Sequence, residues 1–381
     1  MDLFANGAGK TKFGVLDASL FELMREATVA CLQDAETPLE RVDAVVVANF
    51  LAGPQASQLH LNSLFSSVFR EYCGSSFRVE AACASGGAAI HAAAGLLHSP
   101  GVENVLVVGV EKLSGKSTEE TTANIAMAGD RELDQKNGII FPAAYALIAQ
   151  QHSKEFGTTL EDLALVSLKN HANANLNPTA HFHDKKVTLE EIRESQEVCS
   201  PLRLYDCSPL SDGAAAVLLS RNKTSRSVNL AASSLRTDSL SLCQRATLTS
   251  LPAAKAAASD ALAKAKLSIT DVDAFEVHDC FTIAELVAYE DLGLCKPGGA
   301  AALIRNGETT LSGSRPVNPD GGLKADGHPI GASGVAQACE ALLQLRGEAG
   351  KRQVDGCKTM LCHNVGGVGG TAAVTILTAI N

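Results

Sequence analysis

The stretch Val79-Glu80-Ala81-Ala82-Cys83-Ala84-Ser85-Gly86-Gly87-Ala88-Ala89 organises this chain, because an apolar lead runs through one cysteine into residues that almost lack side chains. We expect a strand up to Val79 and a helix made from the small residues, so that Cys83 lies on the turn between them. Free backbone N–H groups and the helix dipole at such a turn favour a thiolate, which predicts a cysteine that is nucleophilic near neutral pH. A small buried cysteine on a well-packed helix is the alternative for this motif alone.

The composition is that of an ordinary globular protein. The 381 residues are 46% hydrophobic and 19% charged, with a formal net charge of −10 and no long run of one sign. This pattern argues against a nucleic-acid or acidic-membrane partner. Eleven cysteines form no CxxC pair, so we expect free thiols in a reducing compartment and no disulfide scaffold.

Neither end shows a targeting signal. Residues 1–13 lack an apolar run of signal-peptide length, and no stretch reaches the roughly 18 apolar residues of a membrane helix. The last four residues do not resemble a peroxisomal Ser-Lys-Leu signal. We therefore expect an intracellular protein without membrane insertion, either cytoplasmic or mitochondrial.

Two halves of the chain repeat one pattern. A predicted helix at 17–34 and strand at 42–47 correspond to a helix at 252–266 and strand at 272–277. Likewise, a helix at 86–97 and strand at 105–110 correspond to a helix at 331–345 and strand at 358–361. Because uninterrupted apolar strands alternate with helices, we expect an α/β architecture of mostly parallel sheets covered on both faces.

Residues 115–200 are more polar and suggest an inserted loop domain that lies over the site. His171, His181 and His183 fall in this Asn-rich segment, without a cysteine or carboxylate partner at ligand spacing. We interpret them as solvent-exposed loop histidines and predict no metal site.

Three motifs in the second half could carry chemistry. His278-Asp279-Cys280-Phe281 follows a predicted strand, and strand ends in α/β folds face the ligand crevice, although an ordinary capped turn is equally compatible. Gly327-His328-Pro329 lies among dense glycines that let backbone approach a ligand, so His328 could serve a nearby thiol as a base. The glycine-rich segment 362–370 follows a strand and could present N–H groups to an oxyanion.

Together the motifs resemble the thiolase superfamily, in particular its sterol-carrier-protein type. The resemblance rests on Cys83-Ala84-Ser85, His278-Asp279-Cys280-Phe281, Gly327-His328-Pro329 and His363-Asn364-Val365-Gly366, in this order. It also covers Lys169-Asn170-His171, Asn177-Pro178 and the segment 346–354.

The resemblance implies a five-layer α/β/α/β/α fold of two similar halves with an inserted loop domain, and a homodimer. The implied divisions are 1–114 and 207–225 for the N-terminal half, 115–206 for the insertion and 226–381 for the C-terminal half. The implied activity is that of an acyl-CoA C-acyltransferase of lipid metabolism. It would cleave 3-ketoacyl-CoA with coenzyme A or condense acetyl-CoA units through an acyl-cysteine, with coenzyme A thioesters as substrates and no cofactor.

The resemblance also implies roles for single residues. Cys83 would be the nucleophile and His328 would take its proton, while Cys280 would be the second acid/base, with Cys362 as its rival. His363 stands where other thiolases carry a catalytic cysteine. His278 and His328 would surround one thioester oxygen, and N–H groups of Cys83 and of Gly366 or Gly367 would hold the other oxyanion.

Further residues are expected near the site with less defined roles. We expect Phe281, Gly327 and Ser333 to bind substrate, and His363 and Asn364 are further candidates. We predict that the acyl tunnel is lined by Met127, Ile139, Ile140, Phe141 and Tyr145, although these residues could equally belong to the hydrophobic core.

Two other functions compete with a thiolase. A decarboxylating ketoacyl synthase would share the fold and the nucleophile but would lack a second catalytic cysteine, so Cys280 argues against it. A non-catalytic scaffold that binds acyl-CoA or a partner protein would be expected to have lost part of the set, whereas Cys83, Cys280 and His328 are all present.

Overall fold

The computed structural model describes residues 2–380 and is organised around one nine-stranded sheet. Its order is β3-β2-β4-β7-β1-β8-β11-β10-β9. The strands are β1 (Phe4–Lys10), β2 (Ala44–Ala48), β3 (Ser75–Val79), β4 (Asn104–Glu111), β7 (Gly213–Ser220), β8 (Val228–Thr237), β9 (Ala274–Glu276), β10 (Thr359–Gly366) and β11 (Thr371–Thr378), with β5 (Glu197–Cys199) and β6 (Leu202–Arg203) forming a separate hairpin.

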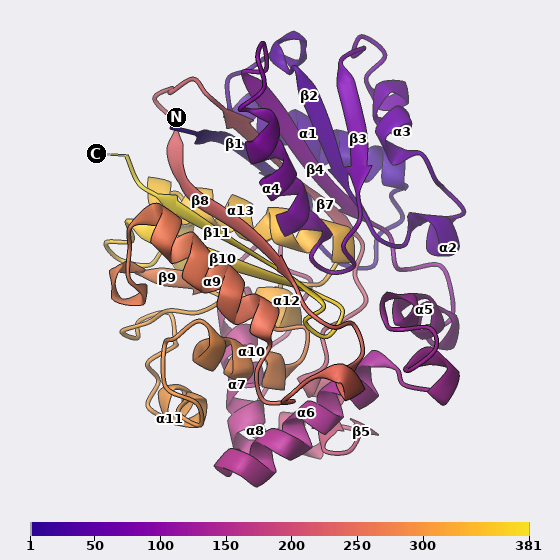
Figure 1. Cartoon of the computed structure of the whole chain (residues 1–381), viewed down its shortest axis with the longest axis vertical. Helices are drawn as coiled ribbons and strands as arrows, with labels where there is room; N and C mark the ends of the chain where they lie inside the picture. The colour runs from indigo at the N-terminus through magenta and orange to yellow at the C-terminus, as the bar shows by residue number, and fades with distance from the viewer. Residues whose placement is uncertain (1, 381) are drawn as a thin grey trace.

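Helices cover both faces of the sheet and fill the space between its halves (Figure 1). The α-helices are α1 (Leu20–Asp34), α2 (Ala52–Ala56), α3 (Leu61–Val68), α4 (Ser85–Leu96), α5 (Thr118–Ile125), α6 (Phe141–Phe156), α7 (Leu160–Ala174), α8 (Leu189–Glu194), α9 (Pro252–Ala265), α10 (Thr282–Asp291), α11 (Ala300–Arg305), α12 (Gly322–Ala325) and α13 (Ile330–Arg346). No helix among residues 2–380 is long and apolar enough to cross a membrane.

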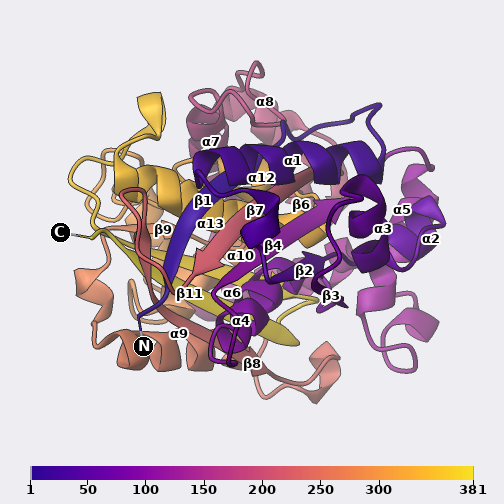
Figure 2. The ribbon, with the colours of Figure 1, turned by 90° about the horizontal axis from the view of Figure 1, so that it is seen from above.

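The sheet bends into two layers. Strands β1 and β8 pair through only two residue pairs, Phe4 with Asn229 and Ala5 with Val228, so the two halves diverge from this corner. Helices α4 and α13 lie between the halves and bury small apolar side chains against both. Figure 2 shows α1 and α9 on opposite outer sides. The order α1, sheet, α4 with α13, sheet, α9 gives the five predicted layers.

The predicted repeat corresponds to an equivalence of the two halves. Strands β1, β2, β4 and β7 of the first half occupy the places of β8, β9, β10 and β11 in the second. Helices α1 and α9 cover the outer faces, and α4 and α13 cover the inner ones. Each half therefore contributes one inner helix, α4 or α13, to the layer between the two halves.

The expectation of mostly parallel sheets is wrong. Pairings β2–β3, β2–β4 and β9–β10 are parallel, whereas β4–β7, β1–β7, β1–β8, β8–β11 and β10–β11 are antiparallel. The central strands β2, β4 and β7 are buried on both faces, so each reads as a continuous apolar run whichever direction it takes. The sequence pattern could not distinguish the two directions.

The segment between β4 and β7 is mainly helical, and its histidines are not solvent-exposed loop residues. It contains α5 to α8, and His171 on α7 is only 1% exposed, stacked on Phe182 and edge-on to Tyr205. His181 and His183 are half-buried. The prediction of exposed histidines is therefore wrong, because α7 packs its polar side against the second half of the chain. The predicted domain boundaries remain a prediction.

The glycines of the inner helices permit the close approach of α4 and α13. A Cβ atom on Gly86 would lie 2.7 Å from the backbone nitrogen of Val335 and 2.9 Å from Cα of Gly334. Gly95, on the same helix, would place its Cβ in open space. The α4–α13 contact therefore excludes any side chain at residue 86.

We predict opposite effects for alanine at these two glycines. Gly86→Ala should destabilise the protein by about 1–3 kcal/mol, because backbone atoms of α13 would have to move. Gly95→Ala should stabilise it by about 0.5–1 kcal/mol through helix propensity. Thermal unfolding of both variants measures the difference, and an equal change in the two would contradict this packing.

Candidate active site

A cavity of about 350 Å³ lies where the two halves meet the segment between β4 and β7. Cys83, Cys280 and His328 all line it, together with Phe281 and Gly367. Most of the remaining wall is apolar and comes from Leu113, Ile125, Phe141, Pro142, Val198, Leu204, Pro209, Leu210 and Ile330. The cavity thus brings together residues that are almost 250 positions apart in sequence.

The turn that carries Cys83 is held in a strained conformation. Ala82 has φ +50°, in the left-handed region, which costs an alanine about 1–2 kcal/mol. The Ser85 hydroxyl accepts the N–H of Ala81 at 2.9 Å and donates to the carbonyl of Ala82 at 2.6 Å, which closes the turn. Cys83 therefore stands just before α4 with a fixed backbone.

His328 precedes α13 in the same way that Cys83 precedes α4. Its Nδ1 lies 2.8 Å from the Ser333 hydroxyl, which itself donates to the carbonyl of Pro329 at 3.0 Å. Since the single hydroxyl proton is already used, Nδ1 of His328 must donate, and Nε2 carries the lone pair. Ser333, which we expected to contact substrate, instead lies behind the imidazole and orients it.

His278 follows β9 and lies beside Cys83 and His328. Its ring centroid lies 5.3 Å from that of His328, in an edge-on arrangement. One ring nitrogen from each histidine and the Cys83 sulfur all lie within 4.8 Å of one another. These distances are short enough for one substrate oxygen or sulfur to contact all three groups.

Burial keeps this set of side chains uncharged. It raises the pKa of Cys83 to about 12, although the N–H groups of Gly367 and Cys83 act in the opposite direction. Burial lowers the pKa of His328 to about 3, and holds that of His278 well below its usual range. These shifts favour a thiol and a neutral imidazole in the unliganded protein, whereas the sequence predicts a thiolate near neutral pH. Desolvation outweighs the helix terminus here.

Cys280 lines the cavity from the loop between β9 and α10. Burial raises its pKa well above the usual value, and the nearby sulfur of Cys83 acts in the same direction. The hydroxyl of Tyr145 interacts with this thiol, and the Tyr145 ring stacks on Phe281 with 4.5 Å between centroids. Cys280 is therefore a protonated thiol beside the nucleophile, packed against an aromatic pair.

The rival residue Cys362 does not line this cavity. Its sulfur lies 3.4 Å from the carbonyl of Gln337 on α13, in the core between the two halves. His363 is also buried, and both of its ring nitrogens lack a hydrogen-bond partner. Both residues lie within β10, which extends to Gly366, whereas we expected a loop after Leu361.

The two predicted N–H donors of the oxyanion hole lie close to the Cys83 sulfur. The N–H groups of Gly367 and of Cys83 itself both act on that sulfur. Gly367 has φ +64°, and a Cβ on Gly366 would overlap the carbonyl oxygen of Ala81. Glycine at these positions lets the end of β10 approach the nucleophile turn closely.

Only part of the predicted tunnel and substrate-contact set lies at the cavity. Phe141 and Phe281 line it, whereas Tyr145 is core behind Cys280. Met127 is 55% exposed, and Met127, Ile139 and Ile140 lie outside the cavity wall. Gly327 also lies outside the wall, with φ +119° in the loop before His328.

Sequence reasoning missed the buried polar groups that hold the catalytic loops. The carboxylate of Asp279 accepts the N–H groups of Leu323 and Lys324 at 2.7 and 3.2 Å, and the amide of Asn170 at 2.7 Å. Asp279 thereby ties the His278 loop to the loop that leads to His328, and ties both to α7. The sequence feature that could have indicated these buried contacts is an asparagine and a lysine on α7, among residues with helical apolar spacing.

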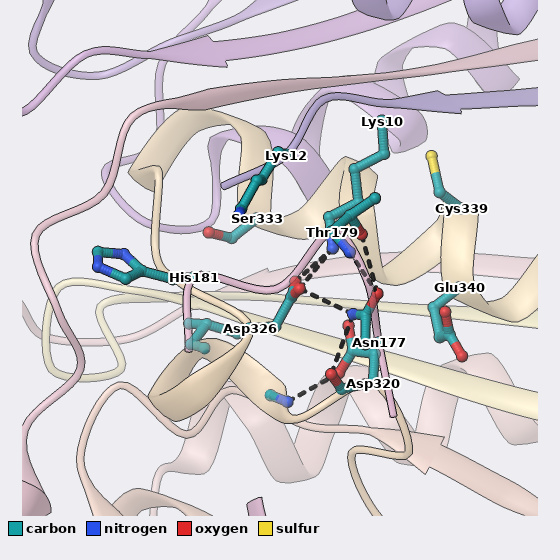
Figure 3. Close-up of polar contacts among 12 residues, drawn as sticks. Lys10, Lys12, Asn177, Thr179, His181, Asp320, Asp326, Ser333, Cys339 and Glu340 are labelled. Carbon is teal, nitrogen blue, oxygen red and sulfur yellow. Dashed lines mark hydrogen bonds and ion pairs between the residues drawn. The ribbon is translucent and has the colours of Figure 1, made fainter. Parts of the chain in front are cut away.

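A second network fixes the His328 loop to β1 (Figure 3). The Lys10 ammonium bonds both oxygens of Asp326 at 2.6 and 2.5 Å, and Asn177 donates to Asp326 at 2.9 Å and to the carbonyl of Asp320 at 3.0 Å. Asp326 is only two residues before His328. Lys10 and Asn177 therefore both hold the loop that leads to His328.

Two family models together match almost the whole chain. The model described as "Thiolase, N-terminal domain" matches residues 6–223, and "Thiolase C-terminal domain-like" matches residues 234–379. The chain belongs to the thiolase family. The match confirms the resemblance that the four motifs indicated. It also confirms the prediction of a thiolase-type acyltransferase.

Two relatives agree with this assignment, and a solved structure shares the fold. The chain is 44% identical over 383 residues to an acetyl-CoA acetyltransferase of Methanothermobacter thermautotrophicus, covering 99% of both chains. It is 34% identical over 395 residues to human sterol carrier protein 2, covering 98% of this chain and 71% of that protein. The crystal structure of human mitochondrial 3-ketoacyl-CoA thiolase superposes with a TM-score of 0.74 at 20% identity, covering 100% of this chain and 99% of that one.

The neutral resting pair predicts how Cys83 reacts with iodoacetamide. With a raised pKa of about 12, the thiolate fraction is small at neutral pH and grows with every step toward that value. Labelling of the Cys83 peptide, followed by mass spectrometry, should accelerate about tenfold per unit between about pH 6 and pH 9. A rate that is already constant below about pH 7 would show a preformed thiolate and contradict the assignment.

Proposed function

We propose that this thiolase forms and cleaves the carbon–carbon bond of acetoacetyl-CoA or a similarly short 3-ketoacyl-CoA, through an acyl group carried on Cys83. The observation that carries the proposal is the presence of two cysteines, Cys83 and Cys280, on one cavity that also holds the unprotonated nitrogen of His328. The name of the archaeal relative, acetyl-CoA acetyltransferase, supports a short acyl group.

In the first half-reaction the Cys83 sulfur attacks the thioester carbonyl of acetyl-CoA while its proton moves to Nε2 of His328. The resulting oxyanion is held by the N–H groups of Cys83 and Gly367. When the carbon–sulfur bond breaks, the coenzyme A thiolate takes the proton of Cys280 and leaves as a thiol. The products are acetyl-Cys83, an imidazolium at His328 and a thiolate at Cys280.

In the second half-reaction the Cys280 thiolate removes a proton from the α-carbon of a second acetyl-CoA. Negative charge then develops on the thioester oxygen, where His278 and the protonated His328 can donate hydrogen bonds. The carbanion attacks acetyl-Cys83 and acetoacetyl-CoA forms. The departing Cys83 sulfur recovers its proton from His328, so that every group returns to its starting protonation state. Thiolysis follows the same steps in reverse.

The cavity is suited to the thiol end of coenzyme A. Its volume of about 350 Å³ is at the lower end of the range for small-molecule sites, which leaves room for little acyl chain beside the pantetheine arm. Among the described residues no lysine or arginine lines its wall. We therefore place the phosphates of coenzyme A outside the cavity, where solvent can hydrate them.

We also propose a homodimer and a cytoplasmic location. The dimer is supported by the open edge of the sheet at β3, where the side chain of Phe77 is 37% exposed. The location is supported by the archaeal relative. Sedimentation equilibrium should give twice the chain mass, and a monomer at micromolar concentration would contradict the proposed dimer.

The proposed roles predict unequal effects of the two cysteine-to-alanine variants Cys280→Ala and Cys362→Ala. Thiolysis of acetoacetyl-CoA should fall by about 10²–10⁴-fold in Cys280→Ala, since the reaction loses its second acid/base. The matched Cys362→Ala variant should stay within a few-fold of the wild type, because that sulfur faces Gln337. Loss of activity in Cys362→Ala alone would transfer the role to Cys362.

The same assay tests the function itself. A longer 3-ketoacyl-CoA should be cleaved more slowly than acetoacetyl-CoA if the cavity limits the acyl chain. A wild-type protein that cleaves neither substrate would contradict the proposal and would favour a synthase or a binding protein.

A further inference from the structure

The amide of Asn364 connects three parts of the active site. This side chain lies on β10 and is 2% exposed. Its Oδ1 accepts the N–H of Gly87 at 3.0 Å, and its Nδ2 donates to the carbonyl of Cys83 at 2.9 Å. The same Nδ2 lies 3.3 Å from Nδ1 of His278. Asn364 therefore contacts the first turn of α4, the nucleophile and one catalytic histidine.

The partners of Asn364 leave only one orientation for its amide. The backbone N–H of Gly87 can only donate, so the atom that faces it must be the oxygen. The carbonyl of Cys83 can only accept, so the atom that faces it must be the nitrogen. The second N–H of that nitrogen is then directed at Nδ1 of His278, which must accept.

This orientation fixes the tautomer of His278. Burial holds the pKa of His278 well below its usual range, so the ring is neutral and carries one proton. With Nδ1 acting as an acceptor, that proton is on Nε2. No protein group pairs with Nε2 of His278 or with Nε2 of His328 among the described residues. The Nε2–H of His278 is therefore available to a bound molecule.

The two histidines consequently face the reacting atoms with opposite functions. Ser333 makes Nδ1 of His328 a donor, which leaves a lone pair at Nε2. Asn364 makes Nδ1 of His278 an acceptor, which leaves a proton at Nε2. Ser333 thus prepares His328 as a base for the Cys83 proton, and Asn364 independently prepares His278 as a donor for a substrate oxygen.

We propose that Asn364 is a positioning residue that holds His278 as the Nε2–H tautomer and so makes it a hydrogen-bond donor to the thioester oxygen of the substrate. The tautomer follows from the contacts alone, whereas its catalytic use rests on the proposed function. Glycines of both inner helices leave the space for this amide. A Cβ on Gly334 would overlap Oδ1 of Asn364, and one on Gly87 would lie 3.2 Å from it.

The first test reads the tautomer directly. In protein labelled with ¹⁵N-histidine, long-range ¹⁵N–¹H spectra distinguish the protonated ring nitrogen from the unprotonated one, and His278→Gln identifies the signals of residue 278. We expect a proton on Nε2 of His278 and on Nδ1 of His328. In Asn364→Asp, whose carboxylate has the same shape but offers no donor, Nδ1 of His278 should become protonated while His328 stays unchanged as an internal reference.

The second test measures the catalytic consequence in two reactions of one enzyme. Exchange of labelled coenzyme A into acetyl-CoA needs only the acyl-Cys83 step, whereas thiolysis of acetoacetyl-CoA also needs the oxyanion that His278 would stabilise. Loss of one such donor typically slows a reaction about 10²–10³-fold. Asn364→Asp should therefore lower thiolysis at least about tenfold more than exchange.

A double-variant comparison separates this role from a structural one. An asparagine at residue 278 keeps an N–H donor that has no tautomer, so in a His278→Asn background the change Asn364→Asp should leave the ratio of thiolysis to exchange nearly unaltered. If Asn364 only supported the nucleophile turn, both reactions would fall together in either background, and the proposal would be overturned.

The spectra keep the proposal testable if Asn364→Asp does not fold. A wild-type protein with the proton on Nδ1 of His278 would overturn it without any variant. An inactive wild type whose His278 still carries the proton on Nε2 would contradict the proposed function and leave the tautomer assignment standing.

Discussion

The close approach of α4 and α13 is the contact on which the active site depends. Where Gly86 meets Gly334 and Val335, backbone packs on backbone with no side chain between. Cys83 lies just before α4 and His328 just before α13, so this contact brings the two residues to one cavity. The duplicated fold thus supplies the nucleophile from one half and the base from the other.

The interior around this contact controls proton positions by hydrogen bonds and excludes fixed charge. Cys83, Cys280, His278 and His328 are all neutral at rest because desolvation is the dominant influence on each. In the proposed mechanism, charge then appears only during turnover, on the imidazolium of His328, the thiolate of Cys280 and the oxyanions of the substrate. Buried acidic side chains such as Asp279 and Asp326 lie behind the site and tie its loops together through hydrogen bonds.

The local spacing of apolar and small residues was sufficient to predict the repeated halves and the elements around Cys83, and the resemblance to thiolases gave the four motifs their roles. The sequence could not predict strand direction, since β7 and β11 are apolar on both faces whichever way they run. It also missed the buried use of His171 and Asn170, whose partners are distant in the chain. The sequence favours a thiolate at Cys83 because the helix terminus is visible in it, whereas the depth of burial, which raises the pKa of that thiol, is not. Asn364 could be named from the motif, but its effect on His278 required its three contacts.

The central claim is that an acyl group passes through Cys83, and trapping that intermediate tests it most directly. The protein would be incubated with acetyl-CoA, quenched in acid, digested and mapped by mass spectrometry. We predict one acetyl group on the peptide that contains Cys83, lost on later addition of coenzyme A and absent from Cys83→Ser. Acetylation of another cysteine in its place, or no acetylated peptide from protein that catalyses thiolysis, would contradict the account.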